Sequence, residues 1–131
     1  MELNDLTGKI IGAAMKVHRT LGPGFLESVY HQALAHELRT QGVPFESEVK
    51  LTVRYDGVIV GDFTADMVVD GRVVVELKAV SALTQAHEVQ TVNCLTATGI
   101  EVGLLLNFGA ASLEFKKKFR THRPADGAFS L

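Results

Sequence analysis

The chain has 131 residues, of which 47% are hydrophobic and 21% are charged, and its formal net charge is −2. This length suffices for one compact domain with a real core, so we expect a single domain over residues 1–131. The apolar runs are far shorter than the roughly 20 residues that span a bilayer, and the N-terminus lacks a basic region followed by an apolar stretch. The composition therefore predicts a soluble cytoplasmic protein with no membrane partner. The single cysteine, Cys94, excludes an internal disulfide and fits a reducing compartment.

Two helices are expected at the start of the chain. Apolar residues recur at helical spacing between Leu6 and Leu21, and the glycines and proline at 22–24 end this helix. A second apolar stripe of the same period covers residues 25–40, and Gly42 follows as a stop signal. The spacing then changes to the alternation of period two that is typical of strands.

Five strands and one more helix are expected in the rest of the chain. Asp-Gly pairs at 56–57 and 70–71 separate the first three strands, and Ser81 can cap a helix that ends near Gly99. The expected strands cover residues 49–55, 58–69, 72–78, 102–108 and 113–119. The order ααβββαββ predicts an α/β fold with a central mixed β-sheet flanked by helices.

The most informative residues are Glu76, Leu77 and Lys78, which close the apolar run of a buried strand. Side chains on a strand alternate between faces, so Glu76 and Lys78 share one face. Burying charge is costly, so an acid and a base that project inward are either neutralised by partners or kept for chemistry. Asp66 lies shortly upstream, and the three charged residues together indicate a metal-dependent site that cleaves phosphodiester bonds.

Whether Asp66 can reach this site depends on the hairpin that joins its strand to the next. A plain two-residue turn would put Asp66 and Glu76 on opposite faces of the sheet. A three-residue loop over 69–71, with Gly71 in the left-handed position of a bulge, puts Asp66 on the face of Glu76 and Lys78. We therefore expect a bulge at this turn.

Two carboxylates on adjacent strands, with the backbone carbonyl of Leu77 between them, form an oxygen site suited to Mg²⁺ or Mn²⁺. Lys78 would lie beside the metal as a point charge. It would orient or help to deprotonate the attacking water and would stabilise the charge that builds up on the phosphate. The competing interpretation is a structural or surface ion pair.

Further motifs support the first interpretation. Gly24, Glu27 and Tyr30 spell G-x-x-E-x-x-Y at the start of the second helix, and downstream segments read TADMVV, VVVELKAV, HEVQ and LLLNFG. Together these residues resemble the GxxExxY protein family, a branch of the PD-(D/E)XK nuclease superfamily, from about residue 4 to residue 120. The resemblance implies a restriction-endonuclease-like core, a divalent metal, metal-binding acids at Asp66 and Glu76, and a catalytic lysine at Lys78.

Glu27 is the helix-borne acid that the same resemblance implies. It lies on the edge of the apolar stripe, so it could point toward the sheet as a third carboxylate and metal ligand. The alternative is a first-turn acid that is favoured by the helix dipole. Tyr30, three residues further on, is expected to support the site by a hydrogen bond to an active-site group.

The third helix carries His87, Gln90 and Cys94 at spacings that stack them on one face. Superfamily relatives that resemble the exonuclease domain of recombination helicase-nucleases carry Q-x-x-x-Y here, whereas this chain has Gln90 followed by Cys94 at the tyrosine position. Gln90 could bind a phosphate or a water at the metal, or it could simply be partly exposed, and the same alternatives apply to His87. Cys94 is expected to be a small buried residue. The other helix histidines, including His31, are expected to have no role.

Basic residues gather near the end of the chain, at Lys116, Lys117, Lys118 and Arg120. Because the whole molecule is slightly acidic, a nucleic-acid partner must be held by a local patch such as this one. The alternative is a solvated strand edge.

The sequence therefore predicts a divalent-metal-dependent nuclease, with DNA as the expected substrate. A binding module that retains the nuclease fold without turnover, and an interaction protein with a purely structural polar cluster, remain as alternatives. A chain of this size has little surface with which to hold a duplex, so we also expect a homodimer or a larger complex.

Overall fold

The computed structural model describes residues 1–123 and 128–130. Its helices are α1 (Leu3–Leu21), α2 (Glu27–Thr40) and α3 (Gln85–Thr98). Its strands are β1 (Phe45–Tyr55), β2 (Val58–Val69), β3 (Val73–Lys78), β4 (Val102–Asn107), β5 (Glu114–Phe119) and β6 (Phe129–Ser130). Within the described residues, no helix is long and apolar enough to cross a membrane.

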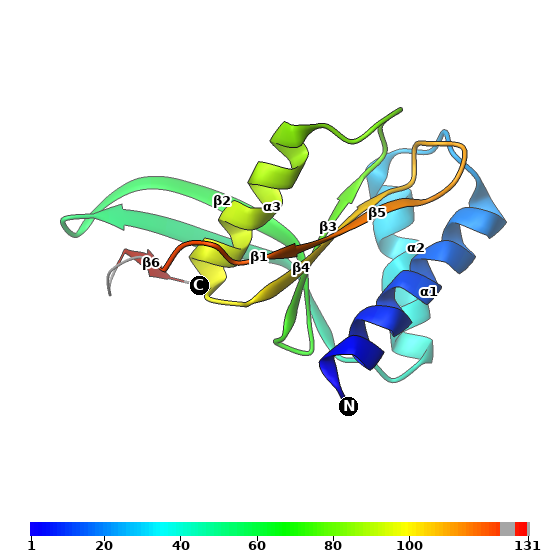
Figure 1. Ribbon diagram of the computed structural model, residues 1–131, viewed down its shortest axis with the longest axis horizontal. Coiled ribbons are helices and arrows are strands. Elements are labelled where there is room, and N and C mark those ends of the chain that lie inside the picture. The colour runs from blue at the N-terminus through cyan, green and yellow to red at the C-terminus, as the bar shows by residue number, and fades with distance from the viewer. Residues whose placement is uncertain (124–127, 131) are drawn as a thin grey trace.

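The strands form one mixed sheet in the order β5-β4-β3-β2-β1-β6. Only the β3–β4 pair is parallel, and a parallel pair needs a long crossover, which α3 supplies. Helices α1 and α2 lie on one face of the sheet and α3 lies on the other (Figure 1). The predicted α/β fold and element order are confirmed, and the sequence analysis missed only the short β6.

A separate apolar core lies on each face of the sheet. The larger core packs α1 and α2 against Met67, Val75, Leu77 and Phe108. The smaller core packs α3 against Leu51, Ala65, Val68 and Val74 from the sheet. Because β3 lies in the middle and is covered on both faces, its residues read as a continuous apolar run.

Helix α3 approaches β4 closely at Gly103. A Cβ atom there would lie 3.1 Å from a methyl carbon of Leu95 and 3.3 Å from the methyl of Thr91. Contacts this short require the two side chains to shift by a few tenths of an ångström, so the glycine at this position supports the close packing of α3 on the sheet. The same close packing allows Cys94, on the next turn, to reach β3.

The β1–β2 pair bends beside Asp66. Glu48 in β1 has a φ of +55°, and it falls between the register pairs Ser47–Met67 and Val49–Ala65. Before the bend Met67 faces α1 and α2, and beyond it Ala65 faces α3. Asp66 lies between Met67 and Ala65, at the point where the side chains of β2 change from one face of the sheet to the other.

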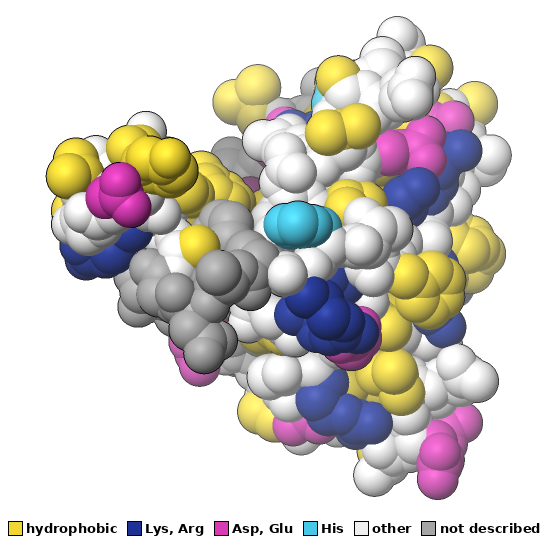
Figure 2. All heavy atoms as spheres, turned by 60° about the vertical axis from the view of Figure 1, so that its left-hand side comes forward, with side chains coloured by type: hydrophobic (Ala, Val, Ile, Leu, Met, Phe, Trp, Pro, Cys, Tyr) yellow, Lys and Arg dark blue, Asp and Glu magenta, His cyan; other side chains and the backbone are white. Residues whose placement is uncertain are grey.

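Beyond this bend the two strands project from the body of the molecule as a long ribbon (Figure 1). Its outer end carries the exposed side chains of Tyr55, Val58, Ile59 and Val60. Hydrophobic side chains accordingly gather on the projecting part at the left of Figure 2. Strand β6 pairs with β1 at Thr52 and Val53 and supports one edge of the ribbon.

Replacing Gly103 with alanine tests the close approach of α3. We expect G103A to lower the free energy of unfolding by roughly 1–3 kcal/mol, because the added methyl overlaps Leu95 and Thr91. Gly8 in α1 has open space around its Cβ position, so G8A should instead stabilise the protein by up to about 1 kcal/mol. Urea unfolding measures both values, and equal effects of the two substitutions would contradict the packing argument.

Candidate active site

The hairpin between β2 and β3 brings Asp66 to the side of Glu76. The register pairs are Met67–Val75, Val68–Val74 and Val69–Val73, so Asp66 is the next residue along β2 and Glu76 the next along β3. The two side chains therefore share a face, as the expected loop parity requires. The loop itself begins one residue later than predicted and covers residues 70–72, with Asp70 and Gly71 both at positive φ.

The carboxylate of Asp66 continues the hydrogen bonding where the β2–β3 ladder ends. The backbone N–H of Leu77 donates to Oδ2 of Asp66 at 2.8 Å. The N–H and C=O of one strand residue leave the backbone on the same side. The carbonyl of Leu77 therefore faces the same side as Asp66, as the predicted oxygen site requires.

Glu76 is buried, with 5% of its surface exposed. Burial and the neighbouring carboxylate of Asp66 raise the pKa of Glu76 from 4.5 to about 8. The thiol of Cys94 on α3 donates to Oε1 of Glu76 at 3.1 Å, and this bond partly opposes the rise. Burial and the adjacent Glu76 raise the pKa of the Cys94 thiol in turn. Cys94 is therefore a protonated donor to Glu76, and not merely the small buried residue that we expected.

Glu27 lies near Lys78 and Asp66. Partial burial raises the pKa of Glu27, whereas the charge of Lys78 lowers it and that of Asp66 raises it. Such effects on Glu27 require Lys78 and Asp66 to lie near it. Among the residues that the structure describes, Lys78 forms no ion pair. Its ammonium group is therefore available to a substrate.

Among the described residues the Tyr30 hydroxyl bonds no active-site group, so the predicted hydrogen bond to the site is wrong. Its hydroxyl donates to the carbonyl of Gly22 at 2.6 Å and accepts from the N–H of Phe25 at 3.1 Å. Its ring is fully buried and stacks on Phe108 with centroids 4.8 Å apart. Tyr30 thus fixes the linker between α1 and α2, in which Gly24 has a φ of +114° that strongly favours glycine. In the G-x-x-E-x-x-Y motif, the first and last residues hold the chain that presents the acid.

The three residues predicted on α3, His87, Gln90 and Cys94, lie on the helix face that is turned toward the site. His87 lies near Glu27, and Cys94 contacts Glu76. Gln90 is exposed and lies between them on the same helix face. His87 also completes a capping box, because its Nδ1 accepts from the N–H of Thr84 at 3.0 Å.

This cap corrects the predicted helix start, since Thr84 takes the role that we gave to Ser81. In the neutral ring the bond to Nδ1 leaves the proton on Nε2. His87 can therefore offer a hydrogen-bond donor to the site.

Asn107 supports the site, and sequence analysis missed it. Its Oδ1 accepts from the N–H of Val80 at 3.0 Å, and its Nδ2 donates to the carbonyl of Val80 at 2.9 Å. The N–H of Phe108 donates to the carbonyl of Lys78 at 2.8 Å. These bonds fix the chain that leaves β3 directly after Lys78. The motif LLLNFG could have indicated this role, because a buried asparagine in an apolar strand needs hydrogen-bond partners.

His31 is a second residue that sequence analysis left without a role. Its Nε2 lies 3.2 Å from Oγ of Ser47, and its Nδ1 lies 3.8 Å from Oε1 of Glu48. Glu48 is the left-handed residue at the bend in β1. His31 therefore ties α2, one turn after Glu27, to the bend that carries Asp66.

The predicted nucleic-acid-binding residues lie on β5 and just beyond it, at an edge of the sheet. Nζ of Lys118 contacts Glu88 at 2.9 Å and Nζ of Lys116 contacts it at 3.7 Å. These contacts, the Lys118 hydrogen bond foremost, lower the pKa of Glu88. Arg120 pairs with Glu101, and Lys117 reaches Asn4.

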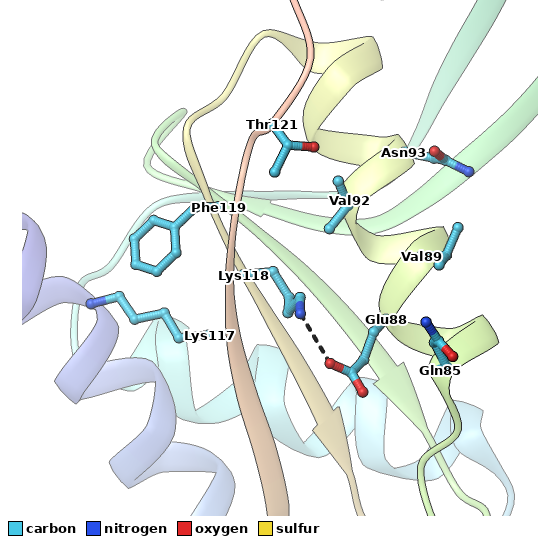
Figure 3. A pocket seen from close by; sticks show the side chains of 9 residues that line it. All are labelled: Gln85, Glu88, Val89, Val92, Asn93, Lys117, Lys118, Phe119 and Thr121. Carbon is cyan, nitrogen blue, oxygen red and sulfur yellow. Dashed lines mark hydrogen bonds and ion pairs between the residues drawn. The ribbon is translucent and has the colours of Figure 1, made fainter.

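The pair between Lys118 and Glu88 crosses a groove of about 570 Å³ between α3 and β5 (Figure 3). Lys116 on β5 lies opposite Leu105 on β4, and Leu105 lies opposite Glu76 on β3, so Lys116 is two strands away from Glu76. At about 4.8 Å per strand, Lys116 is therefore roughly 10 Å from Glu76. The groove lies to one side of the carboxylate pair and is not part of it.

The donor set fits a hard divalent cation. Two adjacent carboxylates repel each other in a buried setting, and an ion between them would relieve that repulsion. Mg²⁺ is commonly held by one or two carboxylates together with waters and substrate phosphates. Among residues 1–123 and 128–130, no group of three or more His, Cys, Asp or Glu side chains lies close enough to hold a metal. Glu27 therefore stands outside the pair formed by Asp66 and Glu76.

A mixed sheet with helices on both faces and two acids on adjacent central strands defines a restriction-endonuclease-like protein. The chain belongs to the PD-(D/E)XK nuclease superfamily, because a family model of that description matches residues 4–120. No curated protein matches the chain.

The crystal structure of SSO0001 is similar, with a TM-score of 0.61 and 18% sequence identity. The alignment covers 73% of this chain and 51% of that chain. This chain thus spans about half the length of SSO0001, and at this identity the likeness shows the fold alone.

The raised pKa of Glu76 predicts how stability depends on pH in metal-free buffer. Between pH 4.5 and about 8 the folded protein holds a proton on Glu76 that the unfolded chain has released. The free energy of unfolding should therefore fall as pH rises through this window. A tenfold change in proton affinity between the folded and unfolded chain corresponds to about 1.4 kcal/mol, so the total fall is a few kcal/mol.

The variant E76Q serves as the control, because glutamine keeps the shape and can still accept from Cys94 but does not titrate. E76Q should show a nearly flat profile and should equal or exceed the wild type in stability at pH 8. Urea unfolding across pH with a chelator present measures this. A variant with the same slope as the wild type would contradict the assignment.

Proposed function

We propose that this chain is a divalent-metal-dependent nuclease that hydrolyses phosphodiester bonds, with DNA as the substrate. The observation that carries the proposal is the sheet face that Asp66, Glu76 and Lys78 share where the β2–β3 ladder ends. A buried Glu76 with a raised pKa, held against a second carboxylate and beside an ammonium group, destabilises the metal-free fold and has an evident use only when a cation and a phosphate are present.

Asp66, Glu76 and the carbonyl of Leu77 would hold the ion, which is Mg²⁺ or Mn²⁺ because all the donors are hard oxygens. When bound, the ion would polarise the phosphate and neutralise part of its charge. Lys78 would stabilise the negative charge that develops on the phosphate oxygens and would orient the attacking water. Cys94 would hold Glu76 in place by its thiol hydrogen bond.

Glu27, His87 and Gln90 would complete the site from the two helices. The raised pKa of Glu27 suits it to accept a hydrogen bond or a proton from the attacking water. The Nε2–H of His87 and the amide of Gln90 are donors that a phosphate can use. Gly24, Glu27 and Tyr30 also support assignment to the GxxExxY branch of the superfamily.

The basic edge formed by Lys116, Lys117, Lys118 and Arg120 would contribute phosphate contacts at some distance from the cut. Lys116, roughly 10 Å from Glu76 by strand spacing, is half exposed, whereas Lys118 and Arg120 are largely occupied by acidic partners. A phosphate bound here would compete with Glu88. We therefore assign this edge a secondary, salt-sensitive role.

A second candidate is a nucleic-acid-binding or protein-interaction module that retains the nuclease fold but has little or no turnover. The absence of a third side-chain ligand beside Asp66 and Glu76 within the described residues favours it. The two candidates differ in whether the wild type cleaves at all.

Replacing Lys78 with alanine separates the candidates. We expect K78A to lose Mg²⁺- or Mn²⁺-dependent cleavage by at least roughly 100-fold, because one electrostatic group at the reacting phosphate contributes this much. Its thermal unfolding should be unchanged, because Lys78 is only partly buried. Cleavage of labelled single-stranded DNA, duplex DNA and RNA measures the activity.

The matched control is K9A, which removes an exposed lysine on α1 and should cleave like the wild type. Full activity in K78A would contradict the assigned role. A wild type that cleaves no substrate with either metal would contradict the nuclease proposal and favour the binding module.

A further inference from the structure

An exposed apolar group surrounds the start of α2. It consists of Phe25, Leu26 and Val29, whose exposed fractions are 50%, 77% and 37%, and we call it the apolar rim. Exposed apolar side chains that lie together are typical of contact surfaces. Glu27 lies within the same stretch of chain, so the apolar rim borders the candidate active site.

The apolar rim is held rigidly. The N–H of Phe25 donates to the hydroxyl of Tyr30, and the ring of Phe25 packs edge-on against Tyr30 with centroids 6.2 Å apart. The carbonyl of Leu26 accepts from the N–H of Val29 at 3.0 Å. A surface that is already ordered loses little conformational entropy when it binds. The linker therefore presents Phe25 and Leu26 to a ligand at low cost.

The position of the apolar rim restricts its ligand. Glu27 lies near Lys78 and Asp66, so a ligand held by those groups would lie beside the chain at Leu26. In the proposed substrate the phosphates suit Lys78 and a cation, whereas apolar side chains suit the flat faces of the bases. An intact duplex covers these faces by stacking, so they are available only where a base is unpaired or unstacked.

We propose that Phe25 stacks on a base of the substrate strand beside the bond to be cut while Leu26 packs against the same base, and that the site acts on single-stranded nucleic acid in preference to intact duplex. This inference rests on the proposed nuclease function for the identity of the ligand. It adds the substrate class and two residues that select it.

A fluorescence experiment tests the stacking directly. The chain contains no tryptophan, so F25W introduces a single reporter at the apolar rim. A single-stranded DNA oligonucleotide should quench its emission in the presence of a chelator, and the same sequence as a duplex should not. The control V60W places the reporter at the exposed end of the β1–β2 ribbon and should not respond. Equal quenching by duplex, or none at concentrations where the strand binds, would overturn the proposal.

Truncation gives a second measurement. F25A should weaken binding of single-stranded DNA roughly 5- to 150-fold, as the loss of one stacked base does, and F25Y should retain it. L26A should also weaken binding, because it removes an apolar contact with the base. Leu26 is so exposed that L26A leaves the fold unchanged, which circular dichroism verifies. Unchanged binding in L26A and F25A would overturn the proposal and would mark the apolar rim as a protein contact.

The outcomes also separate this inference from the nuclease proposal. Quenching of F25W without any cleavage by the wild type would support stacking and contradict the nuclease. Cleavage by the wild type that is equal on duplex and single strand, and unaffected by L26A, would support the nuclease and contradict stacking.

Discussion

Two carboxylates at adjacent positions on neighbouring central strands are the constraint on which the rest of the structure depends. Asp66 and Glu76 approach each other where the β2–β3 ladder ends, and α3 covers Glu76 almost completely. Like charges in a buried setting cannot both ionise without a compensating cation. The metal-free protein responds by holding a proton, which is the physical meaning of the raised pKa of Glu76.

The surrounding residues hold this unfavourable arrangement in place. Asn107 fixes the chain after Lys78, Tyr30 fixes the linker before Glu27, and His31 joins α2 to the bend beside Asp66. None of these three residues lies in the carboxylate pair itself. Each instead orders a segment beside Lys78, Glu27 or Asp66, so the geometry of the site depends on α2 as well as on the sheet.

The sequence predicted most of the fold because local patterns determine it. Alternation of period two located β1, the two Asp-Gly turns bounded β2 and β3, and the loop with Gly71 predicted the face that Asp66 and Glu76 share. The start of α3 was misjudged because Ser81 and Thr84 are both good caps, and only the side chain of His87 selects Thr84. Strand β6 was missed because two residues carry no periodic signal.

The site was harder to predict where a role depends on contacts between distant segments. Tyr30 binds the linker eight residues before it rather than the site, and no spacing rule indicates this choice. Cys94 was expected to be buried, but its hydrogen bond to Glu76 depends on how closely α3 approaches the sheet. The ion pairs of Lys116 and Lys118 with Glu88 join segments about 30 residues apart, so a basic run in the sequence is partly neutralised in the fold.

The most direct test of this account is a crystal structure of the protein grown or soaked in Mn²⁺, with anomalous diffraction to locate the metal. The account predicts one ion between the carboxylates of Asp66 and Glu76, within reach of the Leu77 carbonyl, and its loss in D66N. Crystals with no ion between these carboxylates at millimolar Mn²⁺, or with an ion bound only elsewhere, would contradict it.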